Sequence, residues 1–261
     1  MDYLLVILVA FAASGLTLFS GFGLGTILMP AFALIFPVPT AIAVTAIVHL
    51  ANNVFKVGLI ARHAAWSVVL QFALPAALAA VLGAAAMVMF ASMPVLARYE
   101  LAGRMHDVTA LKLVIGLLIA GFALLDLSGK LEALAVPPKY LALGGLLSGF
   151  FGGLSGNQGA FRSAFLIKAG LDKEAFVATG VVSAVIVDMV RIAVYGVSYA
   201  TSAFEALPDS AVSLVLAATL SAFTGAWLGV RLLEKVTLGV VKTVVALAMA
   251  VIGLGLAGGL I

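Results

Sequence analysis

The chain contains no cysteine and few charged residues. Without cysteine it can form no disulfide, no thiolate metal site and no cysteine nucleophile. Charged residues make up 10% of the chain, against roughly 25% in soluble domains, and the mean hydropathy is +1.27. The net charge of +3 is small and the basic residues are scattered, so nucleic-acid binding has no support. The low charge and high hydropathy leave no room for a separate soluble domain and indicate a protein that lies in a lipid bilayer.

Catalytic and metal-binding patterns are also missing. The three histidines, His49, His63 and His106, lie far apart, and no clustered carboxylates accompany them. There is no HExxH, GxSxG or phosphate-loop lysine motif. We therefore expect no enzyme activity, no metal and no cofactor. A membrane-embedded enzyme remains an alternative.

What the sequence does contain is a series of long apolar runs. A membrane-spanning helix needs about 20 residues, and several of the runs reach that length. Three shorter runs adjoin glycine-rich tips, which is typical of re-entrant or broken helices. The pattern predicts an all-α, polytopic membrane protein with ten helical segments, at residues 3–20, 24–36, 38–61, 66–90, 108–126, 139–152, 156–168, 172–197, 209–230 and 238–260.

The ten runs divide into two sets of five. The tripeptide Ser-Gly-Phe at residues 20–22 recurs at residues 148–150, near the start of the second set. Because five segments is an odd number, the second set must cross the membrane in the opposite sense. We predict a first transmembrane repeat at residues 1–127 and a second, inverted repeat at residues 138–261.

The basic residues predict the orientation. More of them fall on one side of the predicted segments than on the other, which makes that side cytoplasmic and places both termini outside. The cytoplasmic set is Arg62, Lys130, Lys139, Lys168, Lys173, Arg231, Lys235 and Lys242; the outer set is Arg98, Arg104 and Lys112. The polar stretch 93–107 is interpreted as an outer interfacial loop.

The second glycine-rich tip is the strongest candidate site. A helix that begins near Gly159 leaves its first N–H groups unpaired and points its positive end at the tip. Gly156 lets the backbone approach a ligand closely, Asn157 and Gln158 add neutral donors, and Arg162 adds a forked cation suited to oxyanions. The combination predicts an anion-binding site. The alternative is that the glycines serve helix packing and Arg162 reaches an interface.

The first tip is a plainer version of the second. Gly21, Gly23 and Gly25 offer backbone donors but carry no charged neighbour. Packing and anion binding are both open readings at this tip. If the halves are inverted, the two tips should face each other near the middle of the membrane.

The run at residues 38–61 carries a polar stripe. His49, Asn53 and Lys56 lie near one helix face, and polar groups inside a membrane usually face a cavity or a partner. Asn53 is the candidate for the cavity. His49 is either a hydrogen-bonded core residue or a proton carrier, and Lys56 is interpreted as reaching back to the interface.

The run at residues 172–197 carries a second polar face. Thr179 and Ser183 could donate to an anion or bond to their own helix. Asp188 and Arg191 are spaced to pair on one face. The alternative is that Asp188 partners Arg162 or accepts a proton during coupling.

At its glycine tips the chain resembles the sulfite exporter TauE/SafE family, also called the TSUP permeases. The resemblance covers essentially the whole membrane portion. It implies a permease of the bacterial inner membrane for small anions, with sulfite, thiosulfate, sulfoacetate and related organosulfonates as the substrate class. The matching residues are Gly21, Gly23, Gly25 and Pro30 at the first tip and Gly149, Gly152, Gly156 and Gly159 at the second.

Together these observations predict a secondary transporter that works by alternating access. We expect the anion between the two tips, flanked by Asn53, Thr179 and Ser183. Transport would be passive or coupled to H⁺ or Na⁺, because no nucleotide-binding motif is present. An organic-acid permease and an anion channel of the same fold remain alternatives. The expected partners are the small anion, the lipid bilayer and, given the short chain, a second copy in a homodimer.

Overall fold

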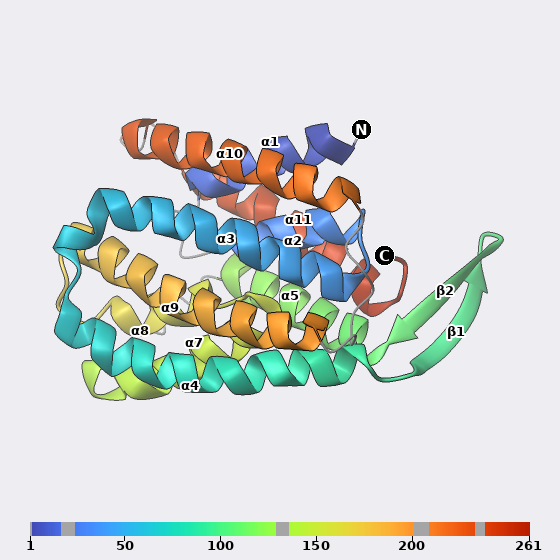
Figure 1. Cartoon of the computed structure of the whole chain (residues 1–261), viewed down its shortest axis with the longest axis horizontal. Helices are drawn as coiled ribbons and strands as arrows, with labels where there is room; N and C mark the ends of the chain where they lie inside the picture. The colour runs from blue at the N-terminus through green and yellow to red at the C-terminus, as the bar shows by residue number, and fades with distance from the viewer. Residues whose placement is uncertain (1, 17–23, 129–135, 201–208, 233–237) are drawn as a thin grey trace.

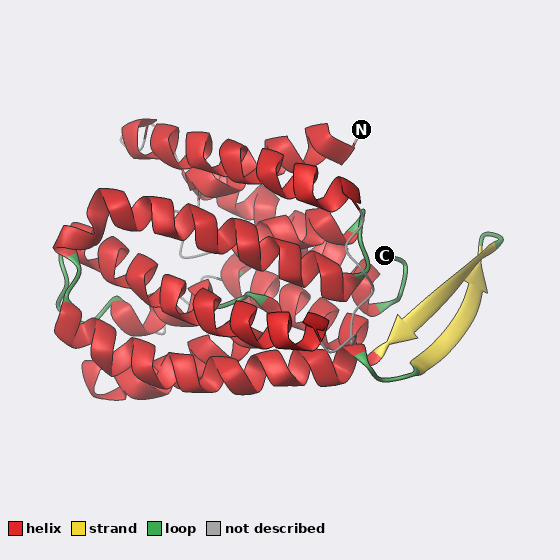
Figure 2. Cartoon of the chain, in the orientation of Figure 1, coloured by secondary structure: helices red, strands yellow, loops and turns green. Residues whose placement is uncertain are grey.

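The computed structural model describes the chain except for residues 1, 17–23, 129–135, 201–208 and 233–237. The described part is a helical bundle with one projecting β-hairpin (Figures 1 and 2). Its first five helices are α1 (Asp2–Leu16), α2 (Leu24–Ala33), α3 (Val38–Ile60), α4 (Trp66–Ala91) and α5 (Ala110–Leu127). The later helices are α7 (Leu141–Ser155), α8 (Gly159–Leu166), α9 (Lys173–Ala200), α10 (Asp209–Leu232) and α11 (Leu238–Ala257).

Four of the described helices are long and apolar enough to cross a membrane. They are α3 with its 3₁₀ extension, α4, α9 and the Ala211–Gly229 portion of α10. The helices α2 and α8 have only 10 and 8 residues, and α7 has 15. At 1.5 Å per residue, 8 residues cover about 12 Å, so α8 cannot cross a bilayer alone. The predicted all-α membrane architecture, with short segments beside the glycine tips, is confirmed.

The helix pair α7–α8 and the helix α1 begin at opposite ends of the bundle. The N–H of Val136, just before α7, donates to the carbonyl of Ala164 in α8 at 3.2 Å. The start of α7 and the end of α8 therefore lie at the same end of the bundle. Both lie at the end where α3 turns into α4, because Gly145 of α7 packs on Phe72 near the start of α4. In contrast, Tyr3 of α1 bonds Ser213 near the start of α10, which is the opposite end. The two chain termini and the β-hairpin also lie at that opposite end (Figure 1).

The helices of the two halves are interleaved. α1 packs along α10, and correspondingly α4 packs along α7; α3 meets α9, and α5 meets α11. We name two sets for later use: the α3 group comprises α1, α2, α3 and α10, and the α9 group comprises α4, α7, α8 and α9. When the halves are exchanged, the α1–α10 pair becomes the α7–α4 pair, and the α3–α9 and α5–α11 pairs map onto themselves, as a pseudo-two-fold axis requires. The inverted repeat and its boundaries stay a prediction that this pattern supports.

Glycines set the closest of these contacts. A Cβ added at Gly149 of α7 would lie 2.0 Å from the carbonyl oxygen of Ala76 in α4, and one at Gly225 of α10 would lie 2.2 Å from the carbonyl of Phe11 in α1. A Cβ at Gly116 of α5 would lie 2.4 Å from the backbone of Ala257 in α11. Small residues let membrane helices approach closely, and dispersion contacts between them then stabilise the bundle. For Gly149 the packing role is therefore clear.

The stretch interpreted as an interfacial loop is instead a β-hairpin. β1 (Val95–Leu101) pairs antiparallel with β2 (Arg104–Thr109). Its turn residues Ala102 and Gly103 have φ of 53° and 75°, as expected for a two-residue turn whose twist suits a hairpin. Tyr99 donates to the carbonyl of Gly258 at 2.6 Å, which anchors the hairpin to the C-terminal end of the bundle.

Candidate functional site

The break between α7 and α8 is fixed by Gly156. This residue ends α7 in the left-handed conformation, at φ 82° and ψ −2°, and its N–H donates to the carbonyl of Gly152 at 2.9 Å. α8 then begins at Gly159, and the N–H of Arg162 is the first to reach a carbonyl of the preceding turn, that of Gln158, at 3.1 Å. The earlier N–H groups of α8 have no such carbonyl available to them. The positive end of α8 therefore opens at the break.

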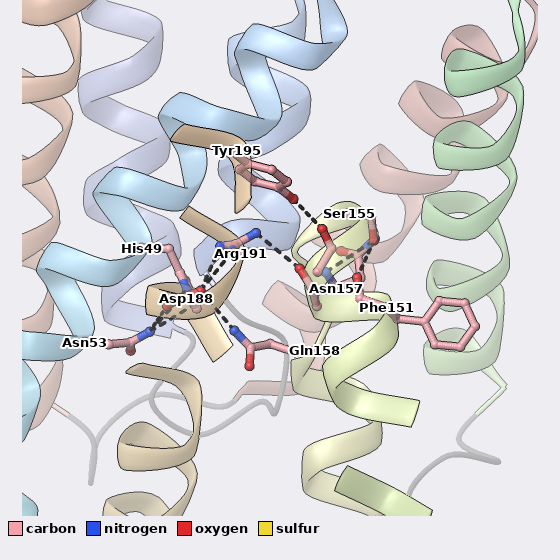
Figure 3. A network of polar contacts seen from close by, with 11 residues as sticks. His49, Asn53, Phe151, Ser155, Asn157, Gln158, Asp188, Arg191 and Tyr195 are labelled. Carbon is pink, nitrogen blue, oxygen red and sulfur yellow. Dashed lines mark hydrogen bonds and ion pairs between the residues drawn. The ribbon is translucent and has the colours of Figure 1, made fainter. Parts of the chain in front are cut away.

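A buried carboxylate joins the break to α3 and α9. Asp188 of α9 is 0% exposed. Its Oδ2 accepts from His49 Nδ1 at 2.6 Å, and its Oδ1 accepts from Arg191 Nε at 3.0 Å. Four side chains converge on it (Figure 3), those of His49, Asn53, Gln158 and Arg191. We call these five residues the Asp188 hub; it is the polar link between the α3 group and the α9 group.

The hub also holds the end of α7. Arg191 Nη1 donates to the carbonyl of Gly152 at 3.4 Å, and Tyr195 donates to the carbonyl of Gly153. Both carbonyls lie in the last turn of α7; that of Gly152 also accepts from the Gly156 N–H, and after it the intrahelical partners run out. A Cβ at Gly156 would lie 2.7 Å from Arg191 Nη1. Gly156 is therefore required twice, by its backbone conformation and by the guanidinium beside it.

The two glycine-rich tips face each other at Gly25. A Cβ at Gly25 would lie 3.5 Å from the carbonyl oxygen of Gly156 and 3.6 Å from the ring of His49. Gly25 thus lies beside both the second tip and the polar stripe of α3. Gly21 and Gly23 lie outside the described residues, so their expected role stays a prediction.

Two polar side chains at the break have unused hydrogen-bonding groups. Asn157 is 3% exposed, and neither its amide nitrogen nor its amide oxygen meets a partner among the described residues. The Nη1 atom of Arg162 is buried and also lacks a partner there. Burying such groups without a partner costs about 1–3 kcal/mol for a neutral group and more for a charge. A ligand that accepts from both groups would remove this cost.

Other predicted donors are already engaged within the protein. Gln158 donates its amide to Asp188 at 3.2 Å. The hydroxyl of Thr179 accepts from the N–H of Ala65 at 3.0 Å, and Ser183 donates to the carbonyl of Thr179 at 2.8 Å. These three side chains form hydrogen bonds within the protein, and contact between them and a ligand stays a prediction.

Lys56 was not predicted to belong to the site. It is only 5% exposed, although it lies one turn before the end of α3. The hydrogen-bonding pattern orients the neighbouring Asn52 amide so that its oxygen accepts from Lys56 Nζ at 3.0 Å and its nitrogen donates to the carbonyl of Ala222 at 3.2 Å. The sequence signal was the i, i+4 spacing of Asn52 and Lys56.

The family model for the sulfite exporter TauE/SafE matches residues 6–256 of the chain. The chain belongs to the TauE/SafE family. No individual curated protein is similar enough to count as a match. The TauE/SafE family is a transporter family whose name indicates export of sulfite, and with the apolar helices it identifies an integral membrane protein. Among the described residues of this TauE/SafE chain, no group of three or more His, Asp or Glu is placed to hold a metal.

Proposed function

We propose that the protein is a secondary transporter that moves a sulfur oxyanion, sulfite or an organosulfonate, across the bacterial inner membrane. The observation that carries the proposal is the break before α8, where the Asn157 amide and Arg162 Nη1 are buried and meet no partner in the part of the chain that the structure describes. Open N–H groups at a helix start favour anions, and Arg matches the geometry of oxyanions. The family supports sulfur oxyanions over carboxylates.

We further propose that transport proceeds by alternating access between the α3 group and the α9 group. Opposed re-entrant tips with broken helices at mid-bundle are typical of secondary transporters. The Asp188 hub spans the interface of the two groups, so its bonds to His49 and Asn53 would break or reform in each cycle. Coupling to H⁺ through His49 and Asp188, or to Na⁺, belongs to the same proposal.

The orientation with both termini outside is also proposed. Arg62, His63 and Lys173 gather where α3 turns into α4 and α9 begins, and His63 pairs with Glu174 there at 3.1 Å. The termini and the hairpin occupy the other end (Figure 1). The positive-inside rule then places the α3–α4 turn in the cytoplasm.

The test is sulfite flux into proteoliposomes that contain purified protein. Arg162→Ala should abolish saturable flux, because it removes the cation at the break. Lys168→Ala is the matched control: Lys168 is exposed and follows α8 by two residues, and its loss should leave flux unchanged. Full flux in the Arg162 variant, or no flux of any sulfur oxyanion in the wild type, would contradict the proposal. Short carboxylates as competitors separate the organic-acid alternative, and single-channel currents separate a channel.

A further inference from the structure

Lys56 is a buried cation whose charge no acidic side chain balances. Among the described residues, the ion pairs of the interior join Asp188 to His49 and to Arg191, and none includes Lys56 or Arg162. The partner of Lys56 is the neutral amide oxygen of Asn52. A buried ammonium bonded only to an amide is costly inside a membrane, and such groups usually mark a substrate path.

Lys56 and Arg162 approach the same region from opposite groups. Lys56 belongs to α3, one turn beyond Asn53, which bonds Asp188. Arg162 belongs to α8, and its Nε lies 3.3 Å from where a Cβ of Gly180 in α9 would be. α9 runs antiparallel to α3, so Gly180 and Lys56 both lie on the side of Asp188 that faces the α3–α4 turn. The missing side chain at Gly180 leaves room for the guanidinium there.

The formal charge of this region is doubly positive. Counted in their ordinary protonation states, with His49 neutral, the positive groups are Lys56, Arg162 and Arg191, and the negative group is Asp188. Arg191 neutralises Asp188 through two contacts, at 3.0 and 2.8 Å. Two positive charges are left over, and like charges in a medium of low dielectric constant repel strongly unless an anion lies between them.

We propose that Lys56 is a second anion-binding residue and that the pair Lys56–Arg162 makes the site selective for doubly charged oxyanions. This inference rests on the proposed function, because it assumes that the substrate anion binds at the break before α8. A dianion such as sulfite would balance both cations, whereas a monoanion such as an alkyl sulfonate would leave one of them uncompensated. Because the two cations belong to different helix groups, a dianion would also draw the groups together.

The experiment compares sulfite with methanesulfonate at mildly alkaline pH, where sulfite carries two charges. Both ligands present the same three-oxygen face to the protein and differ by one charge and a methyl group. Affinities are measured by calorimetry on purified protein, wild type and Lys56→Met, with Lys56→Arg as the charge-retaining control. Melting curves in detergent show whether each variant is folded.

The wild type should prefer sulfite. Lys56→Met should weaken sulfite binding by about ten- to a hundredfold, the value of one hydrogen bond to a charged group, and should leave methanesulfonate affinity nearly unchanged. Lys56→Arg should restore the preference, which a role in packing alone would not predict. Equal weakening of both ligands by Lys56→Met, or no preference in the wild type, would overturn the dianion proposal while the transporter proposal stands. Absence of binding for both ligands to the wild type would instead contradict the proposed function, and with it this inference.

Discussion

The hydrogen-bond partners and the burial of single polar residues in this protein cannot be read from residue type alone. Gln158 looked like a free donor at the tip, but its amide belongs to the Asp188 hub. Lys56 looked like an interfacial lysine, but it is buried and bonded to Asn52. Contact between Gln158 and a ligand stays a prediction, but its partner Asp188 is 30 residues away, and only the fold shows that this donor is already engaged. The partner of Lys56 is near in the sequence, but its burial depends on helices that the sequence does not place.

Gly156 should be the least replaceable glycine at the break. Gly156→Ala forces a Cβ into the left-handed region, at a cost of about 1–2 kcal/mol, and places it 2.7 Å from Arg191 Nη1. We expect a clearly lowered melting temperature in detergent. Gly58→Ala is the control, because Gly58 lies within α3 with nothing within 4 Å of its Cβ position. Equal melting temperatures for the two variants would show that the strain is absent.

Replacing Asp188 alone should lower the free energy of unfolding more than replacing Asp188 and Arg191 together. Asp188→Asn leaves a buried guanidinium without its counter-charge, and breaking such a pair destabilises by about 3–5 kcal/mol. The double variant Asp188→Asn/Arg191→Met removes both charges and should recover part of this loss. Denaturant unfolding of the two variants measures the difference. A double variant less stable than Asp188→Asn would mean that Arg191 acts chiefly through the carbonyl of Gly152.

At the scale of elements, helix positions follow from the sequence while their partners do not. The predicted runs 38–61 and 66–90 match α3 and α4 closely, because apolar length alone specifies a membrane helix. The β-hairpin was not predicted, because its strands are short and the search was for helix-length runs. The pairing of α1 with α10 was not predicted either, since it depends on which glycine faces fit together across the whole chain.

The α4–α7 contact should tolerate no side chain at its centre. Gly149→Ala would place a Cβ 2.0 Å from the Ala76 carbonyl, so α7 must move outward or fail to pack, and the yield of folded protein should fall. Gly121→Ala in α5 is the matched helical control, with nothing within 4 Å of its Cβ position. Size-exclusion profiles in mild detergent compare the two. A monodisperse Gly149→Ala protein with wild-type stability would contradict the tight contact.

The β-hairpin should loosen in acid. Arg98 donates to Asp107 at 2.6 and 3.0 Å, and this hydrogen bond lowers the pKa of Asp107. A lowered carboxyl pKa gives stability that is present above the ordinary value and is lost as pH falls through the lowered value. Hydrogen exchange of hairpin amides should therefore accelerate, relative to its intrinsic rate, at low pH. Arg98→Gln should remove this pH dependence; an unchanged profile would mean that the Tyr99 anchor alone orders the hairpin.

At the scale of the whole molecule, the bodies that move need not be the halves of the sequence. The α3 group contains α10 from the second half, and the α9 group contains α4 from the first. A motion of residues 1–127 against residues 138–261 would have to break the glycine contacts of α1 with α10 and of α4 with α7. Rocking one group against the other has to open the α3–α9 interface and the close approach of Gly25 to Gly156, and it leaves these glycine contacts intact.

Distance measurements between spin labels can test this division, since the cysteine-free chain allows labels at chosen sites. Exposed positions suit the purpose: Leu59 on α3, Met189 on α9 and Leu78 on α4. The Leu59–Met189 distance, between groups, should change when sulfite is added. The Leu78–Met189 distance, within the α9 group, should stay constant although it crosses the two sequence halves. The reverse result would favour motion of the sequence halves.

The pairing of α1 with α10 also governs how the protein is made. Tyr3 and Ser221 find their partners more than 200 residues away, in Ser213 and Ile7. At ribosomal speeds of about 5–20 residues per second, roughly 10–40 s separate the synthesis of α1 from that of α10. During that interval the small-residue face of α1 can meet only lipid or the insertion machinery. The first element made is therefore among the last to reach its final packing, and chains cut short before α10 would reach the membrane with their N-terminal helix unpaired.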